Sequence, residues 1–345
     1  MTGTTQHQQY SRHISKYNTS RMFKLGIIGA GWIAHKMAAT LAQTEDYCVH
    51  AIASRSVEKA KAFAQKWGIS KAYGSYEELV NDDSIDLVYV ATPHSHHLDH
   101  ALLAIRSNKP VLVEKAFTAN TKEAELLLAE AKSRNIFVAE AIWTRYMPLS
   151  MKVKEIMDSG IIGTPRILTA TLCYAMEQKE RILRPELCGG ALLDLGVYTL
   201  NFARMYFGTD IVKTVSNCIM SQSGVDMHEC ISLTYTDGRM ANLQSGALCL
   251  NDRQGIISGT EGYIRIDNVN CPELIEVYRN YELVETYHKP DDMVTGYEYQ
   301  VMECRRCIES GLTQSPMMPH AETIEIMKQM DALRNEWGVV YPADK

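Results

Sequence analysis

A glycine turn between an apolar run and a helix-forming run is the feature that most constrains the fold of this chain. Residues 25–28 are apolar, and the turn Gly29-Ala30-Gly31 leads into residues 32–41, which favour a helix. The spacing G-x-G-x-x-A ends at Ala34, so a pyrophosphate could approach the backbone at Gly31 and rest on the helix N-terminus. Gly29 can adopt the backbone angles that such a turn requires. The pattern therefore predicts a dinucleotide site whose turn contributes Gly29, Ala30, Gly31, Trp32 and Ile33.

Length and charge limit the remaining possibilities. A chain of 345 residues is longer than one hydrophobic core usually supports. We expect a disordered extension over residues 1–21, a nucleotide-binding domain over 22–140 and a second domain over 141–345. The formal net charge of −6 gives no electrostatic basis for binding nucleic acid. No apolar run approaches the roughly 20 residues that cross a bilayer, so we expect no membrane association.

Apolar runs alternate with helical patterns only in the first part of the chain. There the pattern predicts a doubly wound parallel α/β sheet of the Rossmann type. Its strands are expected at residues 25–28, 47–53, 86–91, 110–114 and 136–139. Beyond residue 140, strand-like runs follow one another without intervening helices, which predicts an α+β domain with an open, mainly antiparallel sheet. Helices are expected there at residues 148–160, 191–208, 297–310 and 321–337.

The end of the second predicted strand bears on cofactor choice. NAD-specific enzymes place an acidic residue there to hold the ribose 2′-hydroxyl. This chain instead has Ser54 and Arg55, with Lys59 one helical turn further on. An arginine can pair with a 2′-phosphate dianion, so we predict contacts from Ser54, Arg55 and Lys59 and a preference for NADP over NAD. A solvated basic helix start is the alternative.

Two further strand ends carry polar residues at the edge where cofactors bind in open α/β sheets. The loop after residues 86–91 supplies four predicted cofactor contacts, and the strand at 110–114 supplies two more. These residues are Thr92, Pro93, His94, His97, Glu114 and Lys115. The histidines resemble a metal cluster, but Asp99 is the one other ligand type nearby, so we expect no metal.

The nine cysteines show no paired spacing. Cys304 and Cys307 form a C-x-x-C without the second pair that a zinc site needs. An odd number of scattered thiols is typical of reduced proteins, and we expect a cytoplasmic location.

Asp194 and Tyr198 are four residues apart within the predicted helix 191–208, so they would share one face. A lysine at a strand end, an aspartate and a tyrosine on one helix face could carry out proton chemistry. From the pattern alone, a surface lysine, a polar helix face and a buried aromatic ring are the favoured explanations.

Three motifs in order resemble the glucose–fructose oxidoreductase/inositol dehydrogenase family, from about Phe23 to the C-terminus. They are the glycine fingerprint, Glu114-Lys115, and Gly189-Gly190-x-Leu192-x-Asp194-x-Gly196-x-Tyr198. Residues 140–145, EAIWTR, and the tyrosine at 198 look most similar to the branch of dihydrodiol dehydrogenases and NADP-dependent D-xylose dehydrogenases.

The resemblance implies hydride transfer between a carbinol of a cyclic diol or sugar and a nicotinamide. It assigns catalysis to Lys115, Asp194 and Tyr198, and substrate contacts to Trp143, Arg145, Asp194 and Tyr198. The Lys115 ammonium would lower the pKa of Tyr198, the acid/base, from its usual value near 10. His97 is the next acid/base candidate. Ala116 stands where much of the family has proline, so we expect no cis turn after Lys115.

Two other functions fit parts of the pattern. A non-catalytic NAD(P)-binding sensor would keep the glycine turn and could lose Lys115 and Tyr198, which are both present here. An NAD-linked inositol dehydrogenase would need an acid near position 54. We also expect a homodimer through the C-terminal sheet, because Ile231, Leu233 and Tyr235 alternate with polar neighbours and would make its open face partly apolar.

Overall fold

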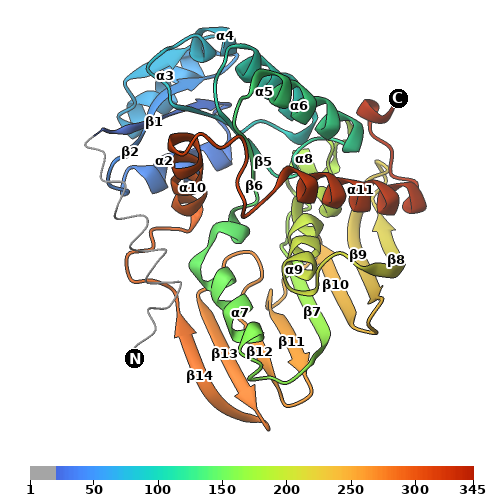
Figure 1. Ribbon diagram of the computed structural model, residues 1–345. Coiled ribbons are helices and arrows are strands. Elements are labelled where there is room, and N and C mark those ends of the chain that lie inside the picture. Colours follow the sequence, from blue (N-terminus) through green and yellow to red (C-terminus); the bar gives the residue numbers. More distant parts are fainter. Residues whose placement is uncertain (1–20) are drawn as a thin grey trace, which may run out of the picture.

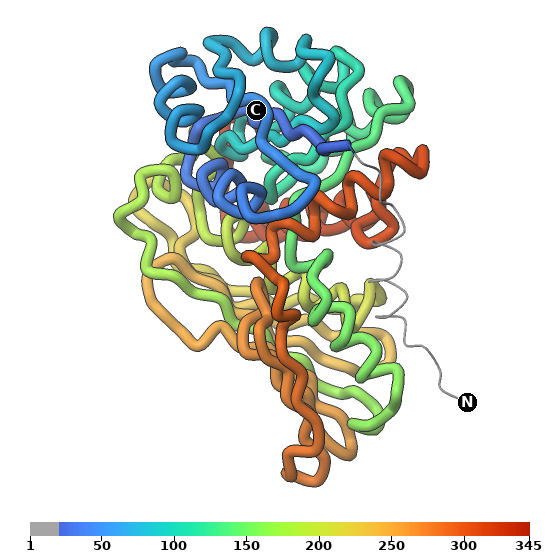
Figure 2. Tube along the Cα trace, turned by 90° about the vertical axis from the view of Figure 1, so that its left-hand side faces the viewer, coloured from blue at the N-terminus to red at the C-terminus, as the bar shows by residue number. Residues whose placement is uncertain are grey.

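The computed structural model describes residues 21–345. Two sheets form its framework, one above the other in Figure 1, with helices around the upper sheet and along one side of the lower one. The view turned by 90° in Figure 2 shows the same two parts, with the blue and cyan segments above the yellow and orange ones. The prediction for residues 1–21 lies outside the described residues, apart from Arg21. No helix within the described part of the chain is long and apolar enough to cross a membrane.

The first sheet has six parallel strands in the order β3-β2-β1-β4-β5-β6. Its strands are β1 (Phe23–Ile28), β2 (Tyr47–Ala53), β3 (Lys71–Tyr73), β4 (Leu87–Val90), β5 (Val111–Glu114) and β6 (Val138–Ala141). Its helices are α2 (Trp32–Leu41), α3 (Val57–Trp67), α4 (Tyr76–Val80), α5 (His97–Arg106) and α6 (Thr121–Arg134). The strand order reverses between β1 and β4, which is where a doubly wound sheet binds its ligand. The predicted Rossmann sheet is confirmed.

The second sheet has eight strands in the order β14-β13-β12-β11-β7-β10-β9-β8. Its strands are β7 (Pro165–Cys173), β8 (Ile211–Met220), β9 (Asp226–Tyr235), β10 (Met240–Gly246), β11 (Gly255–Gly259), β12 (Gly262–Ile266), β13 (Leu274–Arg279) and β14 (Glu282–His288). Every neighbouring pair is antiparallel except β7 and β10. This confirms the open, mainly antiparallel sheet.

The expected single helix over residues 191–208 is divided. A π-helical turn, Leu192–Gly196, precedes α9 (Val197–Phe207). A π turn is wider than an α turn and is frequently found at functional sites, so Asp194 and Tyr198 do not have the simple one-turn spacing that the sequence predicted. Asp226 lies beneath this turn, and its Oδ2 accepts a hydrogen bond from the Leu192 N–H at 2.5 Å.

The remaining helices connect the two halves. They are α7 (Pro148–Asp158), α8 (Glu180–Leu183), α10 (Tyr297–Glu309) and α11 (His320–Trp337). α10 lies beside α2 in Figure 1. Its buried Val301, Cys304 and Cys307 belong to the same apolar cluster as Leu25 and Met37. The chain therefore returns to the first sheet after completing the second, and α10 completes the core of the nucleotide-binding part.

The two faces of the second sheet differ from the expectation. Ile231, Leu233 and Tyr235 are at most 2% exposed, and the ring of Tyr235 packs edge-on against Phe207 at the end of α9. The prediction that these three residues form the open face is therefore wrong. They lie on the face that the helices cover, because this face of the sheet carries the more continuous row of apolar side chains. The open face instead carries the half-exposed side chains of Val215, Ile219 and Met240.

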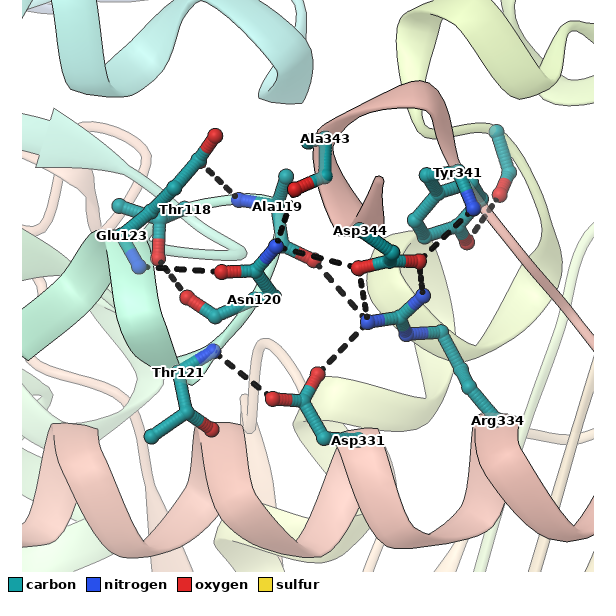
Figure 3. Close-up of polar contacts among 11 residues, drawn as sticks. Thr118, Ala119, Asn120, Thr121, Glu123, Asp331, Arg334, Tyr341, Ala343 and Asp344 are labelled. Atoms are coloured by element: carbon teal, nitrogen blue, oxygen red, sulfur yellow. Dashed lines mark hydrogen bonds and ion pairs between the residues drawn. The ribbon is translucent and has the colours of Figure 1, made fainter.

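The C-terminal segment is fastened by a polar network around Arg334 (Figure 3). The Arg334 guanidinium bonds to Asp331 and Asp344, each at 2.7 Å. Asn120 caps α6 and also donates to Ala343 O at 3.0 Å.

Tyr341 adds a hydrogen bond between the C-terminal segment and the residues before the π turn. Its hydroxyl donates at 2.6 Å to the carbonyl of Gly189, the first residue of the glycine pair that leads into the turn. The end of the chain thus ties α6 and α11 to the segment that carries Asp194.

Replacing Arg334 with Met should lower the free energy of unfolding by about 3 kcal/mol, because the remaining partners of a broken, largely buried ion pair are left uncompensated. Urea denaturation measures the loss. Lys328→Met on the same helix is the control, since its pair with Glu325 is half exposed and solvent screens it, so the loss should be much smaller. Equal losses in the two variants would contradict the proposed role of the network.

Candidate active site

The turn after β1 has the geometry of a dinucleotide site. Gly29 has φ +99°, and a Cβ there would lie 2.9 Å from both Ala91 O and Thr92 Cγ2. Gly31 precedes α2 and supplies no side-chain cap. The first N–H groups of α2 are thus left for a phosphate, which a helix N-terminus attracts.

The end of β2 presents the predicted basic side chains. Ser54 is buried, whereas Arg55 and Lys59 are exposed. Arg55 lies close enough to Tyr76 and His100 for its charge to act on the pKa of both. This places Arg55 at the side of the sheet edge where the ribose of a dinucleotide would lie.

His94 and His97 hold the backbone next to Lys115. His94 Nε2 lies 3.2 Å from the Lys115 carbonyl oxygen. His97 Nδ1 lies 2.9 Å from Ala116 O, and its Nε2 lies 2.8 Å from Thr92 O. Burial lowers the pKa of His94 to about 3 and that of His97 to about 4. Each neutral ring carries one N–H and donates to only one of the carbonyls beside it. Since His97 is fully buried with both ring nitrogens on backbone carbonyls, the structure does not support it as an acid/base.

The peptide bond between Lys115 and Ala116 is cis. The expectation that the missing proline removes this geometry is therefore wrong. His94 contacts the carbonyl group of this peptide bond, and His97 contacts the next carbonyl along the chain, that of Ala116.

Lys115 reaches from the end of β5 to the π turn. Its Nζ donates to the Asp194 carbonyl oxygen at 2.6 Å and to Oδ1 at 3.2 Å. Arg181, from α8, makes two further bonds to the same carboxylate, each at 2.9 Å. Burial alone would raise the pKa of Asp194, but the charges of Lys115 and Arg181 hold it well below its usual range. Asp194 is therefore an anion that fixes both cations.

Tyr198 lies beside this cluster. The Lys115 Nζ is 4.9 Å from the centroid of its ring, and Trp143 Nε1 donates to its hydroxyl oxygen at 2.8 Å. Trp143 in turn stacks on Tyr297, with ring centroids 4.1 Å apart. Because the Tyr198 oxygen accepts from Trp143, its own proton remains available for a substrate oxygen.

The pKa of Tyr198 differs from the sequence expectation. Burial raises it well above its usual value, and the nearby Tyr297 and Glu114 act in the same direction. The Lys115 ammonium, which is directed at Asp194, does not outweigh the effect of burial on the Tyr198 pKa. The predicted lowering of the Tyr198 pKa is therefore not found in the free chain, and the phenol is protonated at neutral pH.

Glu114 lies beneath the cluster rather than at the cofactor surface. It is buried, accepts a hydrogen bond from the Tyr89 hydroxyl, and has its pKa raised by burial to about 7. Arg145 is also directed elsewhere. Its Nε donates to Asn201 at 2.7 Å and its guanidinium pairs with Glu322, so the structure does not bring it to the predicted substrate site.

The structure adds two residues that the sequence pattern did not indicate. Arg181 lies on a four-residue helix, and Tyr297 begins α10, far along the chain. Neither position has a spacing signal, because both contacts depend on the packing of distant segments. In addition, the segment before α8 brings Lys179 over the exposed ring of Trp32, with Nζ 5.7 Å from the centroid. The second half of the chain thus reaches the dinucleotide turn.

Comparison with known proteins agrees with this arrangement. Residues 23–141 match the model of an oxidoreductase family with an NAD-binding Rossmann fold, and residues 150–265 match the GFO/IDH/MocA C-terminal domain. The chain belongs to the GFO/IDH/MocA oxidoreductase family. The N-terminal part of this family member is therefore an NAD(P)-binding domain, as the glycine turn predicted.

Curated relatives of this GFO/IDH/MocA protein cover almost its whole length. Trans-1,2-dihydrobenzene-1,2-diol dehydrogenase from Danio rerio is 34% identical over 92% of this chain and 98% of its own. The enzyme of the same name from Homo sapiens is 31% identical over 93% and 98%.

Solved structures share the fold. A 3-ketoreductase from Actinomadura kijaniata in complex with NADP and TDP-benzene has a TM-score of 0.82 and 25% identity, over 91% of this chain and 97% of its own. An aldose-aldose oxidoreductase from Caulobacter crescentus has a TM-score of 0.83 at 21% identity, over 92% and 98%.

Proposed function

We propose that this chain is an NADP-dependent dehydrogenase that transfers a hydride between a carbinol of a cyclic trans-diol or sugar and the nicotinamide. The contact between Lys115, Asp194 and the Tyr198 ring is the observation that carries the proposal, since a nucleotide sensor has no need of a buried proton donor beside a cation. The names of the relatives, dihydrodiol dehydrogenases, support the diol.

NADP supplies the hydride acceptor, and the protein controls the proton. In the reduction direction the Tyr198 Oη donates its proton to the substrate oxygen, and in oxidation it takes the proton back. Trp143 orients this oxygen. Lys115, 4.9 Å from the ring centroid, is the cation that stabilises the phenolate whenever it forms. Arg181 and Asp194 present charged groups suited to a second substrate hydroxyl.

Aromatic walls favour a ring-shaped substrate. Trp143 and Tyr297 stack on one another, and the Tyr198 ring adjoins them through the Trp143 bond. Flat apolar surfaces of this kind bury a carbocycle or the C–H face of a pyranose, while Asp194 and Arg181 take the hydroxyls. Trans-dihydrodiols and aldopyranoses such as D-xylose both fit this description, and both belong in the substrate panel.

Tyr198→Phe and Lys115→Met should each lower kcat by about 10²–10⁴-fold, since each removes a part of the general acid–base system. NADPH formation across trans-dihydrodiols, aldopentoses, aldohexoses and inositols is the measurement, and NADP affinity should survive Tyr198→Phe. The double variant should be hardly worse than the worse single one, because the lysine acts through the tyrosine.

Tyr206→Phe is the control for the catalytic pair. It removes a buried hydroxyl from the same helix, but that hydroxyl bonds to Ser150 O rather than to the cluster, so turnover should be retained. Near-normal turnover by Tyr198→Phe would exclude it from the mechanism. A wild type that oxidises none of the panel with NADP would overturn the proposed function.

Arg55→Ala should weaken NADP binding roughly 10- to 100-fold, because a charge-assisted contact contributes about 1.5–3 kcal/mol, and should leave NAD binding almost unchanged. Isothermal titration with both nucleotides measures this difference. Lys61→Ala, also exposed on α3, is the control and should bind NADP normally. A wild type with a higher kcat/KM for NAD would contradict the proposed cofactor preference.

We also propose that the chain forms a homodimer through the open face of the second sheet. Val215 and Ile219 are 54% and 60% exposed on the edge strand β8 and would be covered by a second copy. Light scattering at micromolar concentration should show a dimer that Ile219→Asp converts to monomers. A wild type that is monomeric under these conditions would contradict the proposal.

A further inference from the structure

Three side chains of types that can bind a metal ion come from distant segments and meet on the open face of the second sheet. They are Cys173 at the end of β7, His228 on β9 and Cys249 in the loop after β10. Their ligand atoms all lie within 4.8 Å of one another. In the part of the chain that the structure describes, this is the one such group of histidine, cysteine and acidic side chains.

The local backbone is built so that the histidine can reach the thiols. β10 lies between β7 and β9, and its residue Gly246 pairs with Cys173 on one side and His228 on the other. A Cβ at Gly246 would lie 1.7 Å from His228 Nδ1. The imidazole therefore lies across the middle strand, in the space that a side chain at position 246 would fill, and this brings it to the cysteines.

The donor set is typical of one class of metal ion. Thiolate and imidazole ligands together favour zinc, which is bound tetrahedrally at about 2.3 Å from sulfur and about 2.0–2.1 Å from nitrogen. Those bond lengths require about 3.5–3.8 Å between ligand atoms. The exposed Cys249 lies in a loop, so it can move closer by the remaining distance. Three ligands leave a fourth position for water.

We propose that Cys173, His228 and Cys249 bind one Zn²⁺ ion per chain, in a site separate from the dinucleotide turn. The sequence predicted no metal, because its ligands have no recognisable spacing and only the sheet pairing brings them together. The ion displaces the protons of both thiols, so its affinity falls as the pH is lowered.

The position of the site predicts that the bound ion orders the segment that follows β7. Cys173 ends β7, and the segment that follows carries Lys179 to the Trp32 ring and Arg181 to Asp194. Asn251 Oδ1, from the loop that holds Cys249, accepts a hydrogen bond from the Cys173 N–H at 3.0 Å. Zinc would therefore fix the start of the segment that covers the dinucleotide turn.

The test is zinc binding by the full-length, reduced protein after treatment with a chelator. Titration of Zn²⁺ against a chromophoric competitor should give one ion per chain, and Co²⁺ should produce a thiolate charge-transfer band. Cys249→Ser and His228→Gln should each weaken zinc binding at least about 100-fold, since losing even a residue that only supports a ligand costs about 10–100-fold.

Cys230→Ser is the matched control, because Cys230 is exposed on the same strand as His228 but lies outside the cluster. It should bind zinc as the wild type does. Thermal unfolding of the metal-free variants should match that of the metal-free wild type, which establishes that they fold. The proposal is overturned by zinc binding that Cys249→Ser and His228→Gln leave unchanged. Failure of the reduced wild type to bind zinc also overturns it, and so does a Cys173–Cys249 disulfide in the protein as purified.

Discussion

The ion pair between Lys115 and Asp194 joins the two halves of the molecule, and the rest of the site depends on it. The side chains are only 12% and 7% exposed, and charges so far from water require partners. Lys115 comes from the parallel sheet and Asp194 from the π turn beside the antiparallel sheet. Other side chains position both partners. His94 and His97 contact the backbone beside Lys115, and Arg181 bonds to the Asp194 carboxylate.

This pairing also determines the state of Tyr198. With the ammonium directed at Asp194, the buried phenol keeps its proton, and Trp143 occupies one lone pair of its oxygen. The arrangement is that of a proton donor held against an aromatic wall. It explains why a chain with an NAD(P)-binding domain also keeps a lysine and a tyrosine together, whereas nucleotide binding alone would leave them without a role.

Features encoded by local pattern could be predicted from the sequence, and features that depend on packing could not. The turn at Gly29 and the order of strand-like and helical runs predicted both sheets, because periodicity and glycine placement act over a few residues. The π turn, the burial of Ile231 and the direction of Arg145 depend on which surfaces meet. For the same reason the sequence pattern did not indicate Arg181 or Tyr297. The family motifs identified Lys115, but they did not show that its Nζ bonds to the Asp194 carbonyl oxygen and carboxylate.

The protonation of Tyr198 tests this account most directly. An ultraviolet pH titration of the wild type, minus that of Tyr198→Phe, isolates the phenolate of this one residue. Because burial raises the pKa of Tyr198, we expect its hydroxyl to ionise only above about pH 10. Lys115→Met, with the stabilising cation removed, should move it higher still. Ionisation of Tyr198 near neutral pH, or a Tyr198 pKa that is the same in Lys115→Met as in the wild type, would contradict this interpretation.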